Sequence, residues 1–231
     1  ADMGRATVAM ERLDEILSAP LEQEPGKALK PEIRGNIQFS HVNFGYDYPD
    51  EVLKDISFEV RSGQTIGILG ATGSGKSSLV QLLQRLYPVT GGHIYLDGVD
   101  INDIEHEHLR SHIGIVLQEP FLYSRSILDN IRITDPSASA EEVYSAAKAA
   151  AVHDVIQHFD KGYDTLVGER GVTLSGGQQQ RVAIARTLMR KTPILIFDDS
   201  MSAVDTETDQ AIRKALRGIR GQSTTFIISH R

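Results

Sequence analysis

The sequence of 231 residues contains no cysteine. This absence excludes a disulfide framework, a thiolate zinc site and a cysteine nucleophile, and it is compatible with folding in a reducing compartment. Basic residues are also few: 24 Lys and Arg stand against 31 Asp and Glu, for a formal net charge of −7. General affinity for nucleic acid normally requires a basic surface, so we expect no nucleic-acid partner.

Long hydrophobic runs are missing as well. No stretch approaches the ~20 apolar residues that cross a bilayer, and the first residues do not join a basic segment to an apolar one. The sequence therefore predicts a soluble chain that does not itself insert into a membrane. Its length and its 40 % hydrophobic content are sufficient for one large domain with a substantial core.

The N-terminal segment has a pattern of its own. Apolar residues recur at helical spacing from Met10 to Leu17, with charged residues between them, and predict an amphipathic helix. Prolines and a glycine then interrupt the stretch from Pro20 to Pro31. Because proline lacks an amide N–H and fixes its backbone angle, we expect a linker there.

The remaining pattern predicts an α/β fold. Apolar residues alternate with polar ones between Ile37 and Val60, which indicates half-buried, antiparallel strands. Short continuous apolar runs predict buried strands of a mainly parallel sheet at 66–69, 113–117, 194–197 and 226–228. Leucines at 79, 82, 83 and 86 predict a helix, and the stretch from about Ala140 to Leu188 is helical in pattern, with no clear strand. We therefore expect a parallel core with an antiparallel β subdomain and a helical subdomain at about 120–190.

A complete phosphate-binding loop follows the first buried strand. The segment Gly70-Ala71-Thr72-Gly73-Ser74-Gly75-Lys76-Ser77 matches G-x-x-x-x-G-K-[ST] between a predicted strand and a predicted helix. Glycines let the backbone wrap around a polyphosphate, the helix start offers N–H groups, and the lysine adds charge. A dinucleotide-binding turn is disfavoured because no G-x-G-x-x-G is present. The candidate phosphate-binding residues are Gly70, Thr72, Gly73, Ser74, Gly75, Lys76, Ser77 and Ser78, of which Ser77 also binds Mg²⁺.

A second strand supplies an acid. The run from Ile194 to Phe197 ends in Asp198 and Asp199. A carboxylate at the end of such a strand can hold Mg²⁺ beside the phosphates, so Asp198 is a candidate metal ligand. Taken alone, an aspartate at the end of a strand could equally serve to form a turn. The presence of a complete phosphate-binding loop in the same chain favours the interpretation of Asp198 as a metal ligand.

Leu174-Ser175-Gly176-Gly177-Gln178 is the most specific segment of the sequence. It resembles the L-S-G-G-Q signature of the nucleotide-binding domain of ATP-binding-cassette (ABC) transporters. A serine hydroxyl, two glycines and an uncapped helix start would form a second anion site, so Ser175, Gly176, Gly177 and Gln178 are further candidate nucleotide-binding residues. The alternative is that Ser175 only caps the helix.

The resemblance extends from about Ile37 to the end of the chain and implies ATP and Mg²⁺ as cofactors in a P-loop NTPase core. It implies that Tyr46, or as second choice Tyr48, stacks on adenine. Gln118 is similar to the glutamine that senses Mg²⁺ and the attacking water, and His230 to the histidine that contacts the γ-phosphate. The segment 202–205 resembles the loop that contacts the opposite subunit.

One position departs from the family. Efficient members follow the Mg²⁺ aspartate with a glutamate that orients or deprotonates water, whereas here the residue is Asp199. The shorter side chain predicts a slow or degenerate site, since a misplaced general base forfeits much of its effect. Together, Asp199, Gln118 and His230 are the candidate catalytic residues. Such a replacement occurs in one half of heterodimers, and a slow homodimer is the alternative.

Two features resemble exporters in particular. The segment from Thr165 to Gly171 is similar to a T-E-V-G-E-R-G stretch that touches membrane domains, although Leu166 replaces its glutamate. The N-terminal helix resembles the end of a fused membrane domain. The resemblance implies the end of a membrane-domain helix and a linker at 1–35, and a cassette at 36–231 that is truncated at its C-terminus. Expected partners are a second cassette and transmembrane domains, at the cytoplasmic face of a cell membrane.

Other functions remain open at this point. A cassette of this family can be regulatory with little turnover, or it can be a soluble ATPase outside transport, although the long coiled coils or basic linkers of the latter are absent from the sequence. His108 and His112, at i and i+4, could share a metal. They lack the H-E-x-x-H pattern, and exposed polar residues on a short helix explain them adequately.

Overall fold

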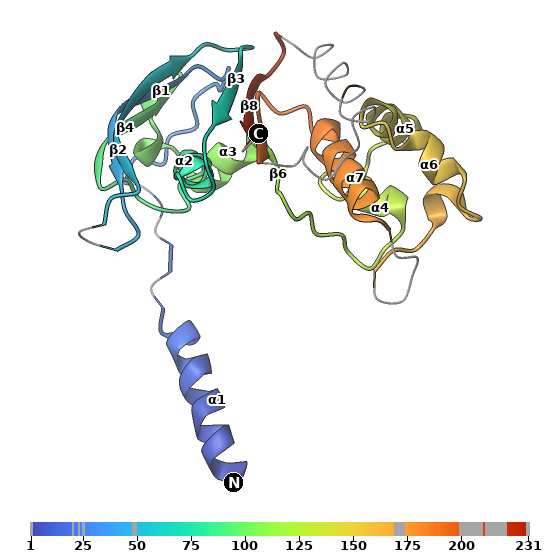
Figure 1. The fold of residues 1–231 in the computed structure, drawn as a ribbon, viewed down its shortest axis with the longest axis horizontal. Helices are drawn as coiled ribbons and strands as arrows, with labels where there is room; N and C mark the ends of the chain where they lie inside the picture. The colour runs from blue at the N-terminus through green and yellow to red at the C-terminus, as the bar shows by residue number, and fades with distance from the viewer. Residues whose placement is uncertain are drawn as a thin grey trace.

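The computed structural model describes residues 2–19, 21–22, 24, 26–47, 50–168, 174–198, 210 and 221–229, and for residues 2–6 the backbone alone. Figure 1 shows the two sheets of the described chain with helices on either side of them. An antiparallel sheet and the helices α2 and α3 lie on one side, and α4 to α7 lie on the other, with the parallel strands between the two groups. The α/β fold with a parallel sheet, an antiparallel β subdomain and added helices is therefore confirmed.

The antiparallel sheet has the strand order β2-β1-β4-β5. Its strands are β1 (Ile37–Phe44), β2 (Leu53–Val60), β4 (Gly91–Leu96) and β5 (Val99–Asp100). The buried residues of β1 change phase, from Ile37 and Phe39 to Val42 and Phe44. A register irregularity between Phe39 and Val42 causes this change, and His41 has a φ of 51° there. The extra residue of a bulge returns the apolar side chains to the core face.

The parallel sheet has the order β3-β8-β7-β6. Its strands are β3 (Thr65–Leu69), β6 (Ile113–Val116), β7 (Ile194–Asp198) and β8 (Thr224–Ser229). In β7, Ile194 and Ile196 belong to a core with the antiparallel sheet, and Leu195 and Phe197 belong to a second core with the helices. Burial on both faces explains why this strand is a continuous apolar run.

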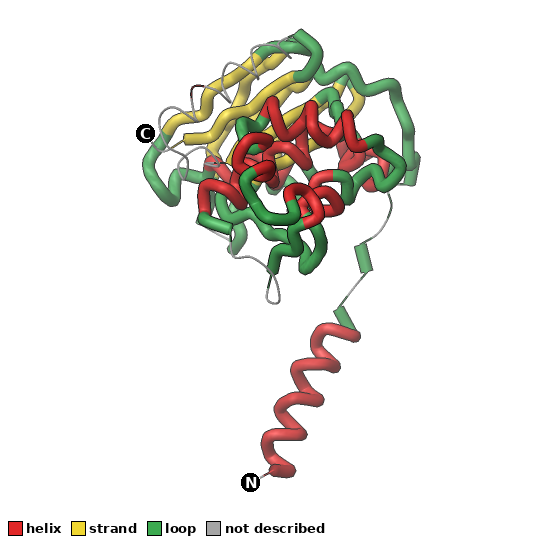
Figure 2. Tube along the Cα trace, turned by 90° about the vertical axis from the view of Figure 1, so that its right-hand side faces the viewer, coloured by secondary structure: helices red, strands yellow, loops and turns green. Residues whose placement is uncertain are grey.

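The helices divide between these two cores. Helices α2 (Lys76–Leu83) and α3 (His106–Ser111), with the short 3₁₀ turn η1 (Ile101–Asp103), pack on the first core. The second core lies among α4 (Ile127–Ile131), α5 (Ala140–Ala149), α6 (His153–Gln157), the 3₁₀ turn η2 (Gly162–Asp164) and α7 (Gly176–Met189). Figure 2 shows these helices in front of the strands. The helical pattern predicted from Ala140 to Leu188 is confirmed in part, because α5, α6 and α7 lie within it. Turns and a β-bridge between Leu166 and Ser126 separate these helices.

The helix predicted through Leu86 is shorter than expected. Helix α2 ends at Leu83, and Leu86 is exposed. Arg85 has a φ of 52° and donates its amide to Leu82 O, while the Leu86 amide bonds to Gln81 O. This pair of bonds, with a residue in the left-handed conformation after the helix, is a Schellman motif, which satisfies the last carbonyl groups of the helix. The fourth leucine of the pattern therefore lies beyond the helix.

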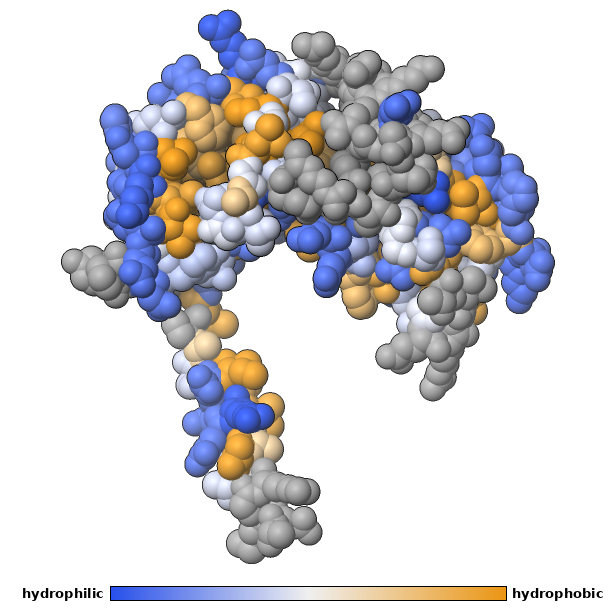
Figure 3. All heavy atoms as spheres, viewed as in Figure 1, coloured by the Kyte–Doolittle hydropathy of each residue, from blue (hydrophilic) through white to orange (hydrophobic). Residues whose placement is uncertain are grey.

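Helix α1 (Asp2–Leu17) includes the predicted Met10–Leu17 helix and begins earlier. It extends away from the rest of the chain in Figures 1 and 2. Its side chains Met10, Leu13, Ile16 and Leu17 are exposed and form the apolar stripe along the helix in Figure 3. Among the described residues, no helix has the length and apolar character that crossing a membrane requires.

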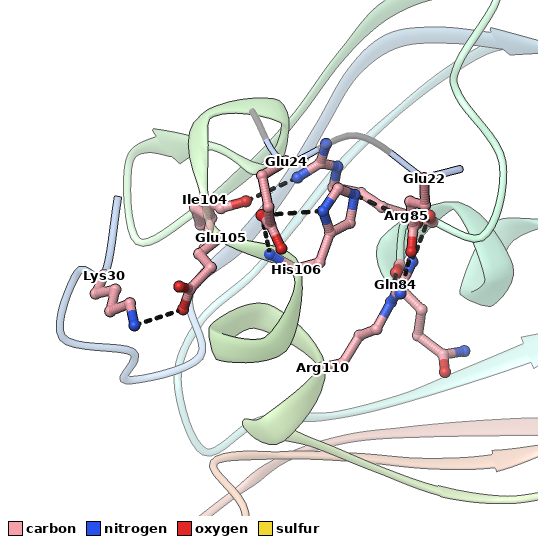
Figure 4. Close-up of polar contacts among 9 residues, drawn as sticks. All are labelled: Glu22, Glu24, Lys30, Gln84, Arg85, Ile104, Glu105, His106 and Arg110. Atoms are coloured by element: carbon pink, nitrogen blue, oxygen red, sulfur yellow. Dashed lines mark hydrogen bonds and ion pairs between the residues drawn. The ribbon is translucent and has the colours of Figure 1, made fainter. Parts of the chain in front are cut away.

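The predicted linker is bound to the core rather than free of it (Figure 4). Arg110 donates two hydrogen bonds to the Glu22 carboxylate, at 2.8 and 2.5 Å. Glu24 Oε2 accepts from the His106 amide at 3.1 Å, and its other partner is the His106 ring. Lys30 Nζ lies 2.8 Å from Glu105. These contacts hold the segment before β1 against α3.

Candidate functional site

The loop between β3 and α2 has the backbone that its glycines permit. Gly73 and Gly75 have φ values of 80° and 86°, in the left-handed region that favours glycine. A Cβ on Gly75 would lie 2.8 Å from Leu53, so the loop also requires glycine for its packing. No side chain caps α2. The first amides of this helix therefore remain available to an anion.

Lys76 adds a full charge to the same loop. Its ammonium donates to the carbonyl oxygens of Gly70 and Ala71, at 2.8 and 2.7 Å. It also lies 3.5 Å from Ser74 Oγ. The lysine at the start of α2 therefore places its charge over the loop and beside the free N–H groups.

The acid at the end of β7 lies next to the start of α2. Ser77 Oγ donates to Asp198 Oδ1 at 3.2 Å. The two strands β3 and β7 both pair with β8 in parallel, so their carboxyl ends meet at one edge of the sheet. A hydroxyl and a carboxylate at this edge are the oxygen ligands that Mg²⁺ prefers, so the residues present fit this ion.

An open pocket of about 370 Å³ joins these groups to two more predicted residues. Gln118, just after β6, lines it, and so does Tyr46, just after β1. The pocket brings together the predicted residues Tyr46, Thr72, Gly73, Gly75, Lys76, Ser77, Ser78, Gln118 and Asp198. Gly70 and Ser74 belong to the loop without lining the pocket. Val52 and Ile228 also line it and were not predicted, because neither has a polar group that marks a site in the sequence.

Tyr46 is held by both its ring and its hydroxyl. The ring packs edge to face with Phe44 and with Tyr87, at centroid distances of 4.8 and 5.1 Å. The hydroxyl lies 2.9 Å from Ser78 Oγ and donates to Gln81 Oε1 at 3.0 Å. Half of the residue remains exposed. An aromatic face at the mouth of an anion-binding pocket suits a nucleobase.

The second predicted site lies at the start of α7, and one expectation about it is wrong. The helix start is capped: Ser175 Oγ accepts from the Gln178 amide at 3.3 Å, and Gln178 Oε1 accepts from the Ser175 amide at 2.9 Å. This capping box uses the glutamine side chain that was predicted to meet an anion. Within the described residues, the amides of Gly176 and Gly177 have no acceptor. The glycine amides therefore remain for a ligand.

Several predicted residues lie outside the described part of the chain. These residues are Asp199, His230, the alternative Tyr48, the segment 202–205 and the glutamate, arginine and glycine at 169–171. The histidines considered as metal ligands face backbone carbonyls: His108 Nε2 lies 2.8 Å from Pro31 O, and His112 Nδ1 lies 2.7 Å from His108 O.

Comparisons with known proteins agree with this geometry. A family model described as ABC transporter matches residues 53–202. The alpha-hemolysin translocation ATP-binding protein HlyB of Escherichia coli O157:H7 is 45 % identical over 231 residues, which are 100 % of this chain and 33 % of HlyB. The beta-(1-->2)glucan export ATP-binding/permease protein NdvA of Bartonella bacilliformis is 48 % identical over 201 residues, which are 87 % of this chain and 34 % of NdvA.

A solved structure gives the same result. The structure of a bacterial Atm1-family ABC exporter with ATP bound superposes with a TM-score of 0.89 and 41 % identity, over 98 % of this chain and 40 % of that one. The chain spans about a third of the length of the curated relatives. Because the family model covers more than half of the sequence and includes both the phosphate loop and the signature, the chain belongs to the ABC transporter family.

Proposed function

We propose that the chain is the ATP-binding and ATP-hydrolysing motor domain of a membrane exporter. The pocket that joins Lys76 and Ser77 to Gln118 and Asp198 is the observation that carries this proposal. The names of the relatives support it, since HlyB is a translocation ATP-binding protein and NdvA an export ATP-binding/permease protein. The structural relative is an exporter with ATP bound.

Each residue of the pocket has a role in this proposal. The Tyr46 ring stacks on adenine, and its hydroxyl bonds fix the ring for that contact. The amides at the start of α2 and the Lys76 ammonium bind the phosphates. Ser77, Gln118 and Asp198 hold Mg²⁺, which when bound neutralises phosphate charge. Asp199 orients the attacking water and His230 contacts the γ-phosphate.

The start of α7 serves a second chain. We assign the site of Ser175, Gly176, Gly177 and Gln178 to the nucleotide of a partner cassette, which packs head to tail on this one. In this site Gln178 holds Ser175 through the capping box. A Cβ on Gly176 would meet no atom of the described residues within 4 Å. The fold itself therefore does not require glycine at this exposed position, and close approach of a ligand does.

The partner cassette is a different chain in this proposal. Asp199 makes the chain's own site slow, and the intact L-S-G-G-Q completes a faster site on a partner that has glutamate after its Mg²⁺ aspartate. A homodimer with slow turnover is the alternative arrangement. If its turnover is very small, the chain is a regulatory cassette that binds ATP and hydrolyses little of it.

Residues 1–35 then belong to the end of a membrane-domain helix and its linker, and residues 36–231 to the cassette, with its helical subdomain at about 120–190. The exposed apolar stripe of α1 supports this division, because such a stripe requires a partner. Leu117, Phe121 and Leu166 are exposed apolar residues, and we assign them to the contact with transmembrane domains of the same transporter. In this proposal the cassette lies at the cytoplasmic face of a membrane.

The test is Mg·ATP hydrolysis by the chain alone and by its mixture with a candidate partner cassette. Gly176→Glu introduces a charge at the second site and leaves the chain's own pocket intact. We expect the mixture to hydrolyse ATP faster than either chain, and Gly176→Glu to remove the increase. Equal rates for parent and variant in the mixture would contradict the shared site.

A further inference from the structure

The segment that carries Gln118 has little packing of its own. Leu117 and Phe121, on either side of it, are 51 % and 69 % exposed. Gln118 and Glu119 are exposed as well. Apolar burial therefore does little to fix the backbone from Leu117 to Glu119, and the nearest apolar anchor after it is the half-buried Leu122. Other contacts must position Gln118.

Helix α7 supplies the first of these contacts. Gln180 is 1 % exposed, and its Nε2 donates to Leu117 O at 3.1 Å. Leu117 directly precedes Gln118 in the sequence. A buried amide that lost this acceptor would have no water to replace it, so the bond fixes the peptide before Gln118.

Arg186, one and a half turns further along α7, supplies the second contact. Its Nη1 donates to Phe121 O at 2.9 Å. Its Nε and Nη2 donate to Asn130 O and Asn130 Oδ1, at 2.8 and 3.0 Å. Burial lowers the pKa of Arg186, partly offset by Tyr123, yet an arginine remains charged. The fixed fork of the guanidinium therefore joins α7 to α4 and to the loop at once.

Asn130 extends this contact into the loop. It is completely buried, and its Oδ1 accepts from the Tyr123 amide at 2.8 Å while its Nδ2 donates to Tyr123 O at 2.9 Å. The loop after Gln118 is thus bonded to Arg186 directly at Phe121 and through Asn130 at Tyr123. Both bonds originate on the helix whose first residues are Gly176 and Gly177.

We propose that Gln180 and Arg186 are positioning residues that fix Gln118 relative to the start of α7. This proposal rests on the proposed function, in which Gln118 and Ser175 act on two different nucleotides. Because α7 bonds to the chain on both sides of Gln118, a shift of α7 against the parallel sheet displaces Gln118. Contact of a partner's nucleotide with the Ser175 end is thereby transmitted to the chain's own pocket.

The test compares Gln180→Met with a matched control on the same helix. Methionine has a similar length and cannot donate. The control is Thr187→Val, which removes the hydroxyl bond to Ile115 O at 3.2 Å from the same face of α7. Ile115 lies inside β6, where pairing with β7 already fixes the backbone. Thr187→Val also removes the hydroxyl bond to Ala183 O within α7, at 3.0 Å. Each variant thus loses one hydrogen bond from α7 to the β6 side, but only Gln180→Met loses a bond beside Gln118.

We expect Gln180→Met to lower kcat about tenfold and to raise the Mg²⁺ concentration for half-maximal rate at least about threefold, since small displacements of a positioned group cost large factors. The KM for ATP should change less than about twofold, because Gln180 does not line the pocket formed by the phosphate loop and Tyr46. Thr187→Val should match the parent in kcat and in Mg²⁺ dependence. Identical values for the two variants would overturn the proposal.

A second measurement, of distances between spin labels, requires no ATP turnover. It uses two variants, so that misfolding of one leaves the other as a test. The chain has no cysteine, so spin labels can be placed at Phe121→Cys and Arg190→Cys, two exposed positions on the loop and at the end of α7. We expect a narrow distance distribution in the parent and a broader one in Gln180→Met and in Arg186→Lys, which keeps the charge without the fork. Unchanged widths in both variants would overturn the proposal.

Failure of the proposed function has a different signature. A parent protein that does not bind Mg·ATP would remove the role assigned to Gln118, and this proposal with it, whatever the label distances are. A parent that binds and hydrolyses Mg·ATP, with Gln180→Met equal to Thr187→Val, would overturn the positioning role alone.

Discussion

Ser77 Oγ lies 3.2 Å from Asp198 Oδ1, although 121 residues separate the two in the sequence. The pairing of β3 and β7 with the intervening β8 produces this contact. It joins the phosphate loop to the acid of the second strand, and it creates a pair of oxygen ligands at the edge of the sheet. Whether this pair binds Mg²⁺ is directly testable.

Asp198→Asn should weaken Mg²⁺ binding. The substitution keeps the size of the side chain and removes its charge, so we expect the Mg²⁺ concentration needed for half-maximal Mg·ATP binding to rise at least about tenfold. Binding of ATP without Mg²⁺ should stay within about twofold of the parent. A titration with Mg²⁺ at fixed ATP measures this, with the exposed Asp160→Asn as control. The same Mg²⁺ dependence in both variants would exclude Asp198 as a ligand.

Tyr46→Ala and Tyr46→Phe separate the ring of Tyr46 from its hydroxyl. Stacking on a base contributes about 1–3 kcal/mol, so the alanine variant should bind ATP about 5- to 150-fold more weakly. The phenylalanine variant keeps the contacts with Phe44 and Tyr87 and loses only the hydroxyl bonds to Ser78 and Gln81. It should lose less than about fivefold. Fluorescent-nucleotide titration measures both, and equal loss in the two variants would show that the hydroxyl matters more than the ring.

The lowered pKa of Asp97 predicts how the stability of the fold depends on pH. Burial raises the pKa of this carboxyl, but hydrogen bonds from the amides of Gly35, Asn36 and Arg34 and from the Asn36 side chain outweigh burial and lower it below its usual 3.8. A carboxyl whose pKa is lower in the folded than in the unfolded protein stabilises the fold at pH values above its unfolded pKa. This stabilisation is lost as the pH falls through the pKa of the folded protein. The loss therefore belongs below about pH 4.

The matching variant is Asp97→Asn, which replaces acceptors by an amide. We expect a loss of about 0.5–1.5 kcal/mol of unfolding free energy at pH 7, because the donors, most of them exposed, lose charge-assisted bonds that water replaces in part. The difference between parent and variant should shrink below about pH 4. Urea unfolding at pH 7 and at pH 3 measures both quantities. A difference that stays constant with pH would mean that the charge of Asp97 is not involved.

Asp199→Glu tests the slow site. The longer side chain restores the reach of a general base, so the purified chain without a partner should hydrolyse Mg·ATP at least several times faster than the parent. The affinity for ATP should not change. Steady-state phosphate release measures the rate, and equal rates would show that the length of the side chain at 199 does not limit turnover.

The sequence predicts those features that short segments encode. The phosphate loop is contiguous, so its glycines, lysine and serine could be assigned from spacing alone. The alternating strands could be predicted too, but the phase change in β1 and the bulge at His41 that causes it are visible only in the structure. Burial of β7 on both faces similarly follows from a continuous apolar run.

Features that depend on distant partners could not be predicted. The early end of α2 follows from the left-handed Arg85, which periodicity does not encode. The start of α7 was expected to be uncapped, but in the structure Ser175 and Gln178 form a capping box. The sequence predicted a linker from Pro20 to Pro31 but not its contacts, in which Glu22 and Glu24 bind Arg110 and His106 on α3, more than 80 residues later. Contacts of this kind depend on tertiary structure and leave no local pattern.

ATP affinity of the parent and of Lys76→Ala is the most direct test of the central claim, that the pocket between β3, β7 and Tyr46 binds Mg·ATP. Lys54→Ala is the control, since Lys54 is an exposed lysine on β2. Calorimetric titration with Mg·ATP should give one site per chain in the parent and in Lys54→Ala, and affinity lower by at least about a hundredfold in Lys76→Ala, as loss of a charge-assisted phosphate contact implies. Equal affinity in all three proteins, or no binding by the parent, would contradict the account.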